Sequence, residues 1–183
     1  MRQVRYNVAT SLDGYIADAS GGFAWIPHDP AVDFAAIFAR VDTVLIGRRS
    51  FEVVQQGGAP AWGPGMQVYV FSRTLRAQAY PEVTVVGDNS ATVVAALRAE
   101  PGDGDIWLFG GGELFSSLLG AGQVDRVEAT IVPVLLGGGV PLAASGVQLT
   151  SLRLVDTHRY PSGMVTLSYA VERRAGQATS VLG

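Results

Sequence analysis

Hydrophobic and polar residues alternate over residues 2–9, where Val4, Tyr6 and Val8 point to one side of the chain. This period of two predicts a β-strand that buries one side and leaves the other exposed or facing a ligand. The next segment, 11–30, is rich in Gly, Asp and Pro and predicts a long loop. A loop of this length inside a compact domain is more often functional than decorative.

Four apolar or β-rich runs further along the chain are typical of strands buried within a sheet. They lie at 43–47, 67–72, 83–87 and 105–110. Helical patterns stand before, between and after these runs, at 31–40, 49–55, 90–99 and 111–120. Such alternation of strands and helices predicts βα units and a parallel sheet.

The first of these helices, 31–40, is expected to begin at Asp29 or Asp33, since either carboxylate suits an N-cap. Ser90 is expected to cap the helix over 90–99 in the same way. The apolar positions of the first helix form a stripe that we expect to face the core, namely Val32, Phe34, Ala35, Ile37 and Phe38.

The end of the chain changes character, because long strand patterns follow one another there with no helix between them. They cover 126–137, 151–160 and 164–173. The turn YPSGM (160–164) has Pro early and Gly late, and predicts a hairpin of the last two strands. The whole pattern predicts an α/β fold with a mixed, mostly parallel sheet, helices on both faces and an antiparallel C-terminal hairpin. We expect one domain, 1–174, followed by a loose tail, 175–183.

The composition of the chain excludes several function classes. A formal net charge of −3 offers no basic surface for nucleic acid. The absence of cysteine excludes disulfides, thiol nucleophiles and cysteine–zinc sites. All 13 basic residues are arginine, so a Walker-type phosphate loop and Schiff-base chemistry, which need lysine, are excluded too. Because the sequence has neither a signal-peptide pattern nor a membrane span, we expect a cytoplasmic protein with no membrane partner. With no cysteine and only two histidines, we also expect no metal site.

Three of the predicted strands end in residues suited to binding phosphate. The segment GRRSFE (47–52) has two arginines at a helix start, where free N–H groups attract anions. The segment FSRTL (71–75) ends a strand with a hydroxyl and a guanidinium, both of which can bind phosphate. In FGGGELF (109–115) a strand runs into three glycines and a helix, which lets the backbone approach a pyrophosphate. Each also has a structural interpretation: a solvated arginine pair, a polar strand terminus, or close helix–sheet packing. Together, at the carboxyl ends of parallel strands, they favour a dinucleotide site.

Five motifs occur in the order SLDGYIA (11–17), TVLIGRRSFE (43–52), VFSRTL (70–75), FGGGELF (109–115) and IVPVLLGGGVPL (131–142). In this order and spacing, the chain resembles the dihydrofolate-reductase-like superfamily. It is most similar to the reductase domain at the C-terminus of the bifunctional riboflavin-biosynthesis deaminase-reductase, and to the stand-alone relatives of that domain. The resemblance implies a mostly parallel sheet with an antiparallel C-terminal strand, NADPH as the cofactor, and a homodimer.

The resemblance also implies roles for single residues at these strand ends. Gly47, Arg48 and Arg49 would bind phosphates of the cofactor, and Ser72 and Arg73 would bind its 2′-phosphate. The pyrophosphate would be bound by the segment Gly110, Gly111, Gly112, Glu113 and Leu114. Ala9 and Ile16 would flank the nicotinamide. The substrate would lie near Asn7, Trp25, Asp29 and Asp33. Two residues depart from the riboflavin-pathway pattern, in which a lysine usually stands at the position of Asn7 and a glutamate at that of Phe109.

The implied activity is that of an NADPH-dependent reductase similar to 5-amino-6-(5-phosphoribosylamino)uracil reductase, with hydride transfer to a C=N or C=O bond of a small heterocyclic or carbonyl compound. Asp13, which follows the first strand, is the candidate catalytic residue for relaying a proton, although Asp-Gly is also an ordinary turn dipeptide. Two alternatives stay open, a non-catalytic NADPH-binding module and a dimeric interaction protein without a ligand.

A second glycine triplet, LGGGVPL (136–142), is expected to act differently from the first. It follows a long strand, and Pro141 prevents a helix from starting cleanly at its glycines, so it lacks a helix dipole. We therefore expect the segment 109–115 to touch the pyrophosphate, and 136–142 to be a loop that shapes the pocket or the dimer interface.

Overall fold

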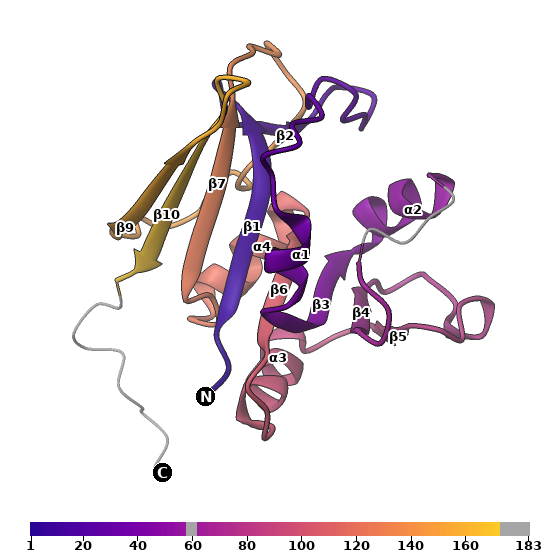
Figure 1. Cartoon of the computed structure of the whole chain (residues 1–183). Coiled ribbons are helices and arrows are strands. Elements are labelled where there is room, and N and C mark those ends of the chain that lie inside the picture. Colours follow the sequence, from indigo (N-terminus) through magenta and orange to yellow (C-terminus); the bar gives the residue numbers. More distant parts are fainter. Residues whose placement is uncertain (58–61, 173–183) are drawn as a thin grey trace.

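The computed structural model describes residues 1–57 and 62–172, which form one large sheet, a two-stranded ribbon and flanking helices (Figure 1). The large sheet contains β1 (Val4–Ser11), β3 (Val41–Gly47), β4 (Gln67–Phe71), β5 (Thr84–Val86), β6 (Asp105–Gly110), β7 (Arg126–Val132), β9 (Leu152–Arg159) and β10 (Val165–Val171). The ribbon pairs β2 (Tyr15–Ala17) with β8 (Val140–Pro141). The tail expected at 175–183 lies outside the described residues.

The strands of the large sheet follow the order β5-β4-β3-β6-β1-β7-β10-β9. Those from β5 to β7 are parallel to one another, whereas β10 runs antiparallel to both β7 and β9. The mixed, mostly parallel sheet and its antiparallel C-terminal hairpin are therefore confirmed. All the parallel strands end at the same edge of the sheet, where α/β proteins gather their ligands.

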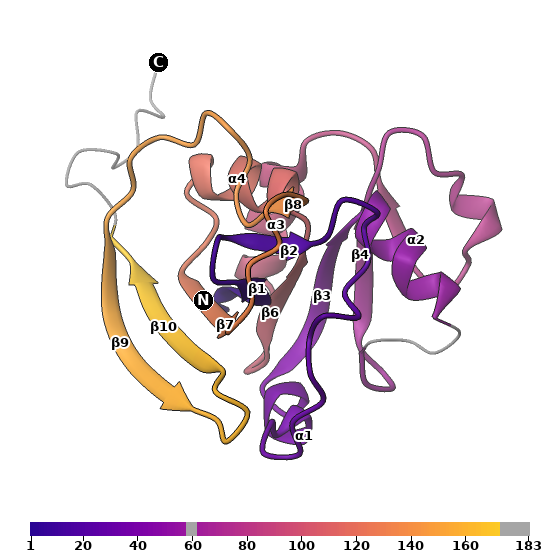
Figure 2. The same cartoon turned by 90° about the horizontal axis from the view of Figure 1, so that it is seen from above.

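Helices cover both faces of the sheet (Figure 2). On one face, α3 (Ser90–Ala99) and α4 (Gly112–Gly120) pack against Val4 and Tyr6 of β1. On the other face, α1 (Phe34–Phe38) and α2 (Arg48–Gln56) pack around Trp107 of β6. This division follows from the period of two in β1 and β6, because successive side chains of a strand point to opposite faces. None of the described helices is long and apolar enough to cross a membrane.

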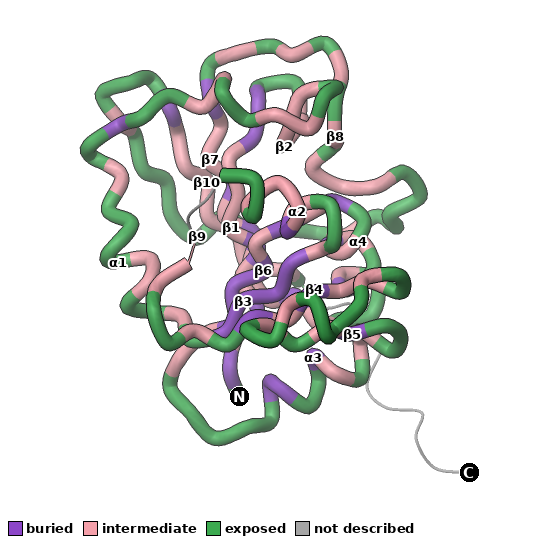
Figure 3. The backbone as a smooth tube through the Cα atoms, turned by 90° about the vertical axis from the view of Figure 1, so that its right-hand side faces the viewer, coloured by how far each residue is buried: buried purple, intermediate pink, exposed green. Residues whose placement is uncertain are grey.

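Burial decreases from the middle of the sheet to its C-terminal edge (Figure 3). Within β3, the residues from Thr43 to Ile46 are all buried, as expected for a strand between two layers of helices. Every residue of β9 is exposed, and this edge strand has a neighbour on one side only.

The face that carries α1 and α2 is apolar over β3, β4 and β6 but polar over β1, β7 and β10. We call this second part the polar face; its members are Asn7, Glu128, Thr130, Thr166 and Ser168, together with Ala9. Strand pairing aligns them, since Asn7 lies opposite Glu128, and Ala9 opposite Thr130. None of them belongs to either hydrophobic core cluster of the described residues. The fold thus leaves polar side chains beside the carboxyl ends of β1 and β7.

The helix expected at 31–40 is shorter than predicted, and its apolar stripe is not buried. α1 spans only Phe34–Phe38 and contains no buried residue; Phe34 is 55% exposed. Asp33, one of the two expected caps, is the N-cap, and its carboxylate accepts the Ala36 N–H at 2.8 Å. A helix of little more than one turn cannot present a long stripe, and within it Phe38 contacts Trp107.

Three smaller expectations also need correction. The N-cap of α3 is Asn89, not Ser90, which is the first helical residue. The strand expected over 126–137 ends at Val132, because Pro133 has no N–H to continue the ladder and the chain turns there. The loop expected over 11–30 contains β2, whose two-residue partner β8 is too short to give a strand pattern.

Candidate functional site

Two helix N-termini lie side by side at the carboxyl edge of the sheet. Gly47 is the N-cap of α2 and Gly111 is the N-cap of α4, and neither has a side chain to satisfy the free N–H groups of its helix. The two turns are in contact, since a Cβ atom added to Gly47 would lie 3.6 Å from both the Gly110 carbonyl oxygen and the Gly111 nitrogen. Because uncapped helix N-termini attract anions, their pairing suits a ligand with several phosphates.

The first glycine triplet requires small residues for two separate reasons. Gly110 has a φ of +151°, which residues with a side chain rarely adopt, and a cis peptide bond joins it to Gly111. Gly112 is buried, and a Cβ atom there would stand 2.4 Å from the Pro141 carbonyl oxygen. Glu113 and Leu114 follow in the first turn of α4. The structure thus brings the predicted glycines of both turns together at one edge.

Arginine side chains surround these helix starts. The Arg48 guanidinium is held by the Glu52 carboxylate at 2.7 Å and donates to the Thr74 hydroxyl at 2.5 Å. Arg49 and Arg73 are exposed, and within the described part of the chain neither has an ion-pair partner. These two guanidinium groups are therefore available to a bound phosphate.

Ser72 lies beside this cluster because β4 pairs with β3, with Phe71 opposite Gly47. Its Oγ accepts the backbone N–H groups of Thr74 at 3.2 Å and Leu75 at 2.9 Å. The hydroxyl therefore fixes the turn that carries Arg73, a structural role in addition to the phosphate contact predicted for it.

Asp13 fastens the second glycine segment to the turn after β1. Its carboxylate accepts hydrogen bonds from the Ser11 hydroxyl at 2.6 Å and from the N–H groups of Leu136 at 3.1 Å and Gly137 at 2.7 Å. The Ser11 hydroxyl first, and then these N–H groups, lower the pKa of Asp13 to about 2. A carboxylate that is ionised at neutral pH holds no proton to donate. The geometry therefore favours a structural role for Asp13 in the turn after β1 over the proton relay.

The second glycine segment lies across the ribbon and the start of α4. A Cβ atom added to Gly139 would stand 2.1 Å from the Ala17 carbonyl oxygen, and the Leu142 N–H donates to the Gly14 carbonyl at 2.8 Å. Pro141 in turn covers the first turn of α4 through its contact with Gly112. The segment is therefore not wholly the loop that was expected, because it contains β8 of the ribbon. A role in shaping the pocket or the dimer interface stays a prediction.

Ala9 and Ile16, the residues expected to flank a nicotinamide, lie on the neighbouring strands β1 and β2. The turn between these strands is fixed by the Thr10 hydroxyl, which donates to the Tyr15 carbonyl at 3.2 Å, and by the Ser11 hydroxyl, which accepts the Tyr15 N–H at 2.9 Å. Both Ala9 and Ile16 are partly exposed.

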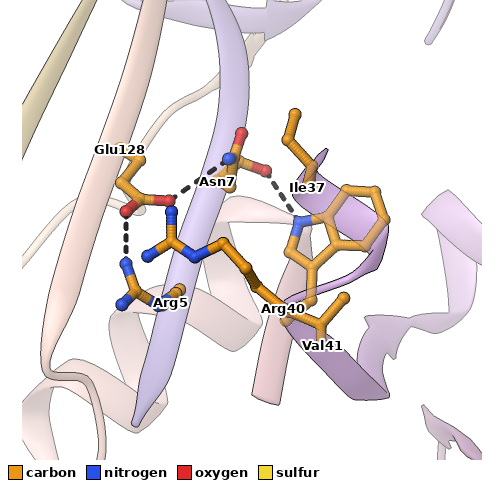
Figure 4. A pocket seen from close by; sticks show the side chains of 7 residues that line it. Arg5, Asn7, Ile37, Arg40, Val41 and Glu128 are labelled. Carbon is orange, nitrogen blue, oxygen red and sulfur yellow. Dashed lines mark hydrogen bonds and ion pairs between the residues drawn. The ribbon is translucent and has the colours of Figure 1, made fainter. Parts of the chain in front are cut away.

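A charge network forms the floor of the polar face (Figure 4). Glu128 accepts hydrogen bonds from Arg5 at 2.6 Å and from the Asn7 amide at 3.2 Å. Arg5 also pairs with Asp105 at 2.5 Å. Burial alone would lower the pKa of Arg5, but the Asp105 and Glu128 carboxylates raise it above its ordinary value. The floor is therefore a set of paired charges held across three neighbouring strands, β6, β1 and β7.

A small pocket opens above this network, and its walls come from the end of α1 and from β6. Trp107 donates its Nε1–H to the Asn7 carbonyl at 3.0 Å, and Arg40 extends across the pocket toward Glu128 (Figure 4). The lining residues are Arg5, Asn7, Ile37, Arg40, Val41, Trp107 and Glu128. An aromatic ring, an amide and a guanidinium surround this opening, which by itself has room for about one water molecule.

Three residues predicted to lie near the substrate have partners within the protein. Trp25 donates its Nε1–H to a carbonyl of its own loop at 3.2 Å, and Asp33 caps α1. Asp29 is buried and accepts two backbone N–H groups, one of them that of Ser162 in the β9–β10 turn at 3.1 Å. The contact with Ser162 lowers the pKa of Asp29. These contacts tie the loop before α1 to the hairpin, and substrate contacts of the three residues stay a prediction.

Several polar-face residues were not identified from the sequence, above all Glu128, Thr130 and Thr166. The hydroxyls of Thr130 and Thr166 lie 2.7 Å apart on neighbouring strands. The alternation of Arg126, Glu128 and Thr130 in β7 is a period-two signal that could have indicated a polar side of this strand.

Comparison with known proteins identifies the family. A model of the RibD C-terminal domain matches residues 2–166. The chain belongs to this family. It is 32% identical over 179 residues to the uncharacterized protein YyaP of Bacillus subtilis (strain 168), and the aligned region covers 92% of this chain and 94% of YyaP. It is 30% identical over 152 residues to the riboflavin biosynthesis protein RibD of Mycobacterium tuberculosis (strain H37Rv), and the aligned region covers 75% of this chain and 44% of that protein.

Solved structures agree with this membership of the RibD C-terminal domain family. A candidate riboflavin biosynthesis protein from Shewanella sp. PV-4 superposes with a TM-score of 0.80 at 29% identity, over 94% of this chain and 100% of that one. Dihydrofolate reductase from Enterococcus faecalis, complexed with NADP(H), superposes with a TM-score of 0.65 at 18% identity, over 93% and 97% of the two chains. The fold is therefore dihydrofolate-reductase-like, as the sequence motifs indicated.

The two departures from the riboflavin-pathway pattern both fall on the α1 side of this RibD C-terminal domain. Asn7 uses its amide to bind Glu128. Phe109 packs its ring against Trp107, with centroids 5.0 Å apart, and against Trp62 at 6.4 Å. An amide and an aromatic cluster thus occupy the two positions where the resemblance implied charges.

Proposed function

We propose that this member of the RibD C-terminal domain family is an NADPH-dependent reductase of a C=N or C=O bond in a small heterocyclic or carbonyl compound. One observation carries the proposal: the uncapped N-termini of α2 and α4 adjoin one another at the ends of parallel strands. A dinucleotide presents phosphates at several points along its length, and this edge offers several anion contacts. The superposition on a dihydrofolate reductase that holds NADP(H) supports the same cofactor.

The residues at this edge fit such a cofactor. The free N–H groups of the first turn of α4 would hold the pyrophosphate, and Arg49 at the start of α2 would add a cation. Ser72 and Arg73, at the end of β4, would hold a 2′-phosphate, which distinguishes NADPH from NADH. The backbones of Ala9 and Ile16 would orient the nicotinamide toward the polar face. Bound NADPH supplies the hydride, while the chain supplies position, electrostatics and a proton.

The polar face supports a planar substrate. Trp107 offers an aromatic ring, the Asn7 amide offers a hydrogen-bonding group, and Arg40 offers a cation at the pocket opening. Asn7 lies two residues before Ala9 on the same side of β1, about 7 Å along the strand. A heterocycle bound over the opening of this pocket would therefore lie next to a nicotinamide held at Ala9.

The proposal is tested by following the absorbance of reduced nicotinamide while the purified chain is mixed with NADPH and a panel of compounds. The panel contains pterins, aminopyrimidines such as 5-amino-6-(5-phosphoribosylamino)uracil, and small carbonyl compounds. Turnover of at least one compound supports a reductase. Tight NADPH binding without any turnover supports a non-catalytic NADPH-binding module instead. No NADPH binding at all would overturn the cofactor assignment.

We further propose that the chain forms a homodimer through β9. This edge strand is exposed along its whole length. Exposed large hydrophobic residues gather in and before it, namely Val147, Leu149, Leu152, Leu154 and Val155. An edge strand with an apolar surface is a template for pairing with another chain.

A second copy of β9 complements this strand in charge. The two copies of β9 would pair in antiparallel fashion, with the twofold axis passing between Leu154 and Val155. In this register Arg153 of each protomer lies opposite Asp156 of the other. Both side chains point to the same face, because they lie opposite Ala170 and Ser168 of β10. A twofold interface makes such a contact twice.

Light scattering tests the homodimer, with the wild type expected at the mass of two chains and Leu154→Glu at the mass of one. Phe34→Glu is the matched control, because Phe34 is also an exposed large hydrophobic residue but lies on α1. A monomeric wild type, or an unchanged mass for Leu154→Glu, would contradict pairing through β9.

A further inference from the structure

A row of three hydroxyl groups crosses the polar face from β7 to the end of the hairpin. The Oγ1 atoms of Thr130 and Thr166 lie 2.7 Å apart, and Thr166 donates to the Tyr160 hydroxyl at 3.5 Å. The ring of His158 meets that of Tyr160 edge-on, with centroids 4.5 Å apart. His158 is exposed. The row therefore connects the interior of the polar face with solvent.

The inner end of this row lies where reduction would take place under the proposed function. Thr130 is paired with Ala9 across β7 and β1, and both residues point to the polar face. Glu128, which lines the pocket, precedes Thr130 by two residues on the same side of β7. Thr130 is thus beside the expected nicotinamide position, two residues along β7 from a residue that lines the pocket.

The carboxyl groups around the site are already engaged. Asp13, whose pKa is lowered to about 2 by the Ser11 hydroxyl and N–H donors, holds the loop at Gly137. Asp29 holds Ser162, a contact that lowers its pKa as well. Glu128 accepts from Arg5 and Asn7. A reduction that needs a proton has to obtain it from another group.

We propose that Tyr160, Thr166 and Thr130 form the proton-delivery path of this reductase, with Tyr160 as the acid. The inference rests on the proposed function. As hydride adds to the carbon of the C=N or C=O bond, the electron pair of that bond moves to the nitrogen or oxygen, which takes a proton from Thr130 Oγ1. Thr130 regains a proton from Thr166, Thr166 from Tyr160, and the tyrosinate from solvent beside His158. The substrate gains one hydride and one proton, and the three hydroxyls are restored.

The hydrogen-bond chemistry of the row allows this direction of transfer. Each hydroxyl both donates and accepts, and rotation about its C–O bond reverses the row. The separation of 3.5 Å between Thr166 and Tyr160 is longer than the roughly 2.8 Å of an ordinary hydroxyl pair. Catalytic hydrogen bonds often tighten when a substrate binds, so the path needs only a small movement of the hairpin end.

The test compares Tyr160→Phe, Thr166→Val and Thr166→Ser in the full chain, with a compound that the wild type reduces. Tyr160→Phe and Thr166→Val should each lower kcat by about 10²-fold, the usual contribution of a positioned acid. Thr166→Ser keeps the hydroxyl and should retain most of the rate. The double variant Tyr160→Phe/Thr166→Val should lose no more than either single variant, because both break the same path. The dissociation constant for NADPH should be unchanged in all four.

A second measurement tests the row without turnover. With isotope-labelled tyrosine, the NMR resonance of Tyr160 should shift in Thr166→Val but not in Thr166→Ser. Near-normal kcat in Tyr160→Phe and Thr166→Val would overturn the path and leave the reductase proposal intact. Additive losses in the double variant would also overturn it, since they indicate two independent structural effects. No turnover by the wild type would overturn the reductase proposal, and the path with it.

Discussion

Gly112 lies directly against Pro141, so that a Cβ atom added to Gly112 would stand 2.4 Å from the Pro141 carbonyl oxygen. Ser116 strengthens the contact, because its hydroxyl donates to the Gly112 carbonyl at 2.7 Å and accepts the Ala144 N–H at 2.8 Å. The first turn of α4 is thereby joined to the segment that follows the second glycine triplet. The two triplets are parts of one corner of the molecule.

Gly112→Ala should destabilise the protein by about 1–3 kcal/mol, the usual cost of forcing an extra methyl group into a packed site. The obstacle is a backbone carbonyl, which cannot move aside as a flexible side chain can. Gly120→Ala is the matched control: Gly120 ends the same helix, and nothing lies within 4 Å of its added Cβ. Urea unfolding should show a loss for Gly112→Ala and little change for Gly120→Ala. Equal midpoints for the two variants would contradict the contact.

Asp13→Asn should remove a pH-dependent part of the stability. The pKa of Asp13 is about 2 in the folded protein, and about 3.9 is normal for an unfolded chain. Because the folded value is the lower one, the stabilisation is complete above about pH 4 and is lost as the pH falls through about 2. The difference in melting temperature between wild type and Asp13→Asn should therefore shrink from pH 4 to pH 2.

Asp103→Asn serves as the control for this titration, since Asp103 is exposed in a loop and makes no hydrogen bond in the described part of the chain. At pH 4 and above its melting temperature should stay close to that of the wild type, because its side chain has no hydrogen bond to lose. An offset for Asp13→Asn that does not change with pH would contradict the role given to its carboxylate.

Arg73→Ala should weaken the binding of NADPH about tenfold or more and leave that of NADH nearly unchanged. A hydrogen bond to a charged group contributes about 1.5–3 kcal/mol, and only NADPH carries the 2′-phosphate that this guanidinium would hold. Arg76→Ala, at another exposed arginine three residues away, should change neither affinity. Fluorescence titration with both nucleotides measures the effect. Equal losses for NADPH and NADH in Arg73→Ala would refute the 2′-phosphate assignment.

Glu128→Gln should lower the free energy of unfolding by about 1–3 kcal/mol, because it removes the charge from a largely enclosed pair with Arg5. The side chains of Arg5 and Glu128 are only 14% and 13% exposed. Glu52→Gln, which breaks the exposed pair with Arg48, should cost about 0.5 kcal/mol or less. Denaturant unfolding of both variants provides the comparison, and a larger loss for Glu52→Gln would contradict the importance of the enclosed network.

The sequence predicted best those elements whose signal is local. The run at 43–47 lies within β3, and the hairpin of β9 and β10 follows from the turn at 160–164. The length and the burial of the helix at 31–40 were overestimated. Its apolar residues have the spacing of a stripe that faces the core, but the chain forms little more than one turn of helix there. Burial of a stripe depends on what lies opposite, which a local pattern does not contain.

The same distinction holds for the candidate site. The glycines that the structure brings together at this edge could be found from the sequence, since Gly47 and Gly110 each end a strand that a helix follows within two residues. Their contact with a cofactor stays a prediction. The polar face was mostly missed, because Asn7 meets Glu128 only through the pairing of β1 with β7. Asp29 was linked to a substrate, yet it binds Ser162 in a hairpin that follows much later in the chain. Such contacts depend on strand order, which no local motif specifies.

The proposed NADPH site at the ends of β3, β4 and β6 is tested most directly by calorimetric titration of the full chain with NADPH, and with NADH as the comparison. We predict saturable binding of one NADPH per chain, with NADH bound more weakly because it lacks the phosphate that Arg73 and Ser72 would hold. Absence of heat with NADPH, or equal affinity for the two nucleotides, would contradict a site built from these helix N-termini and arginines.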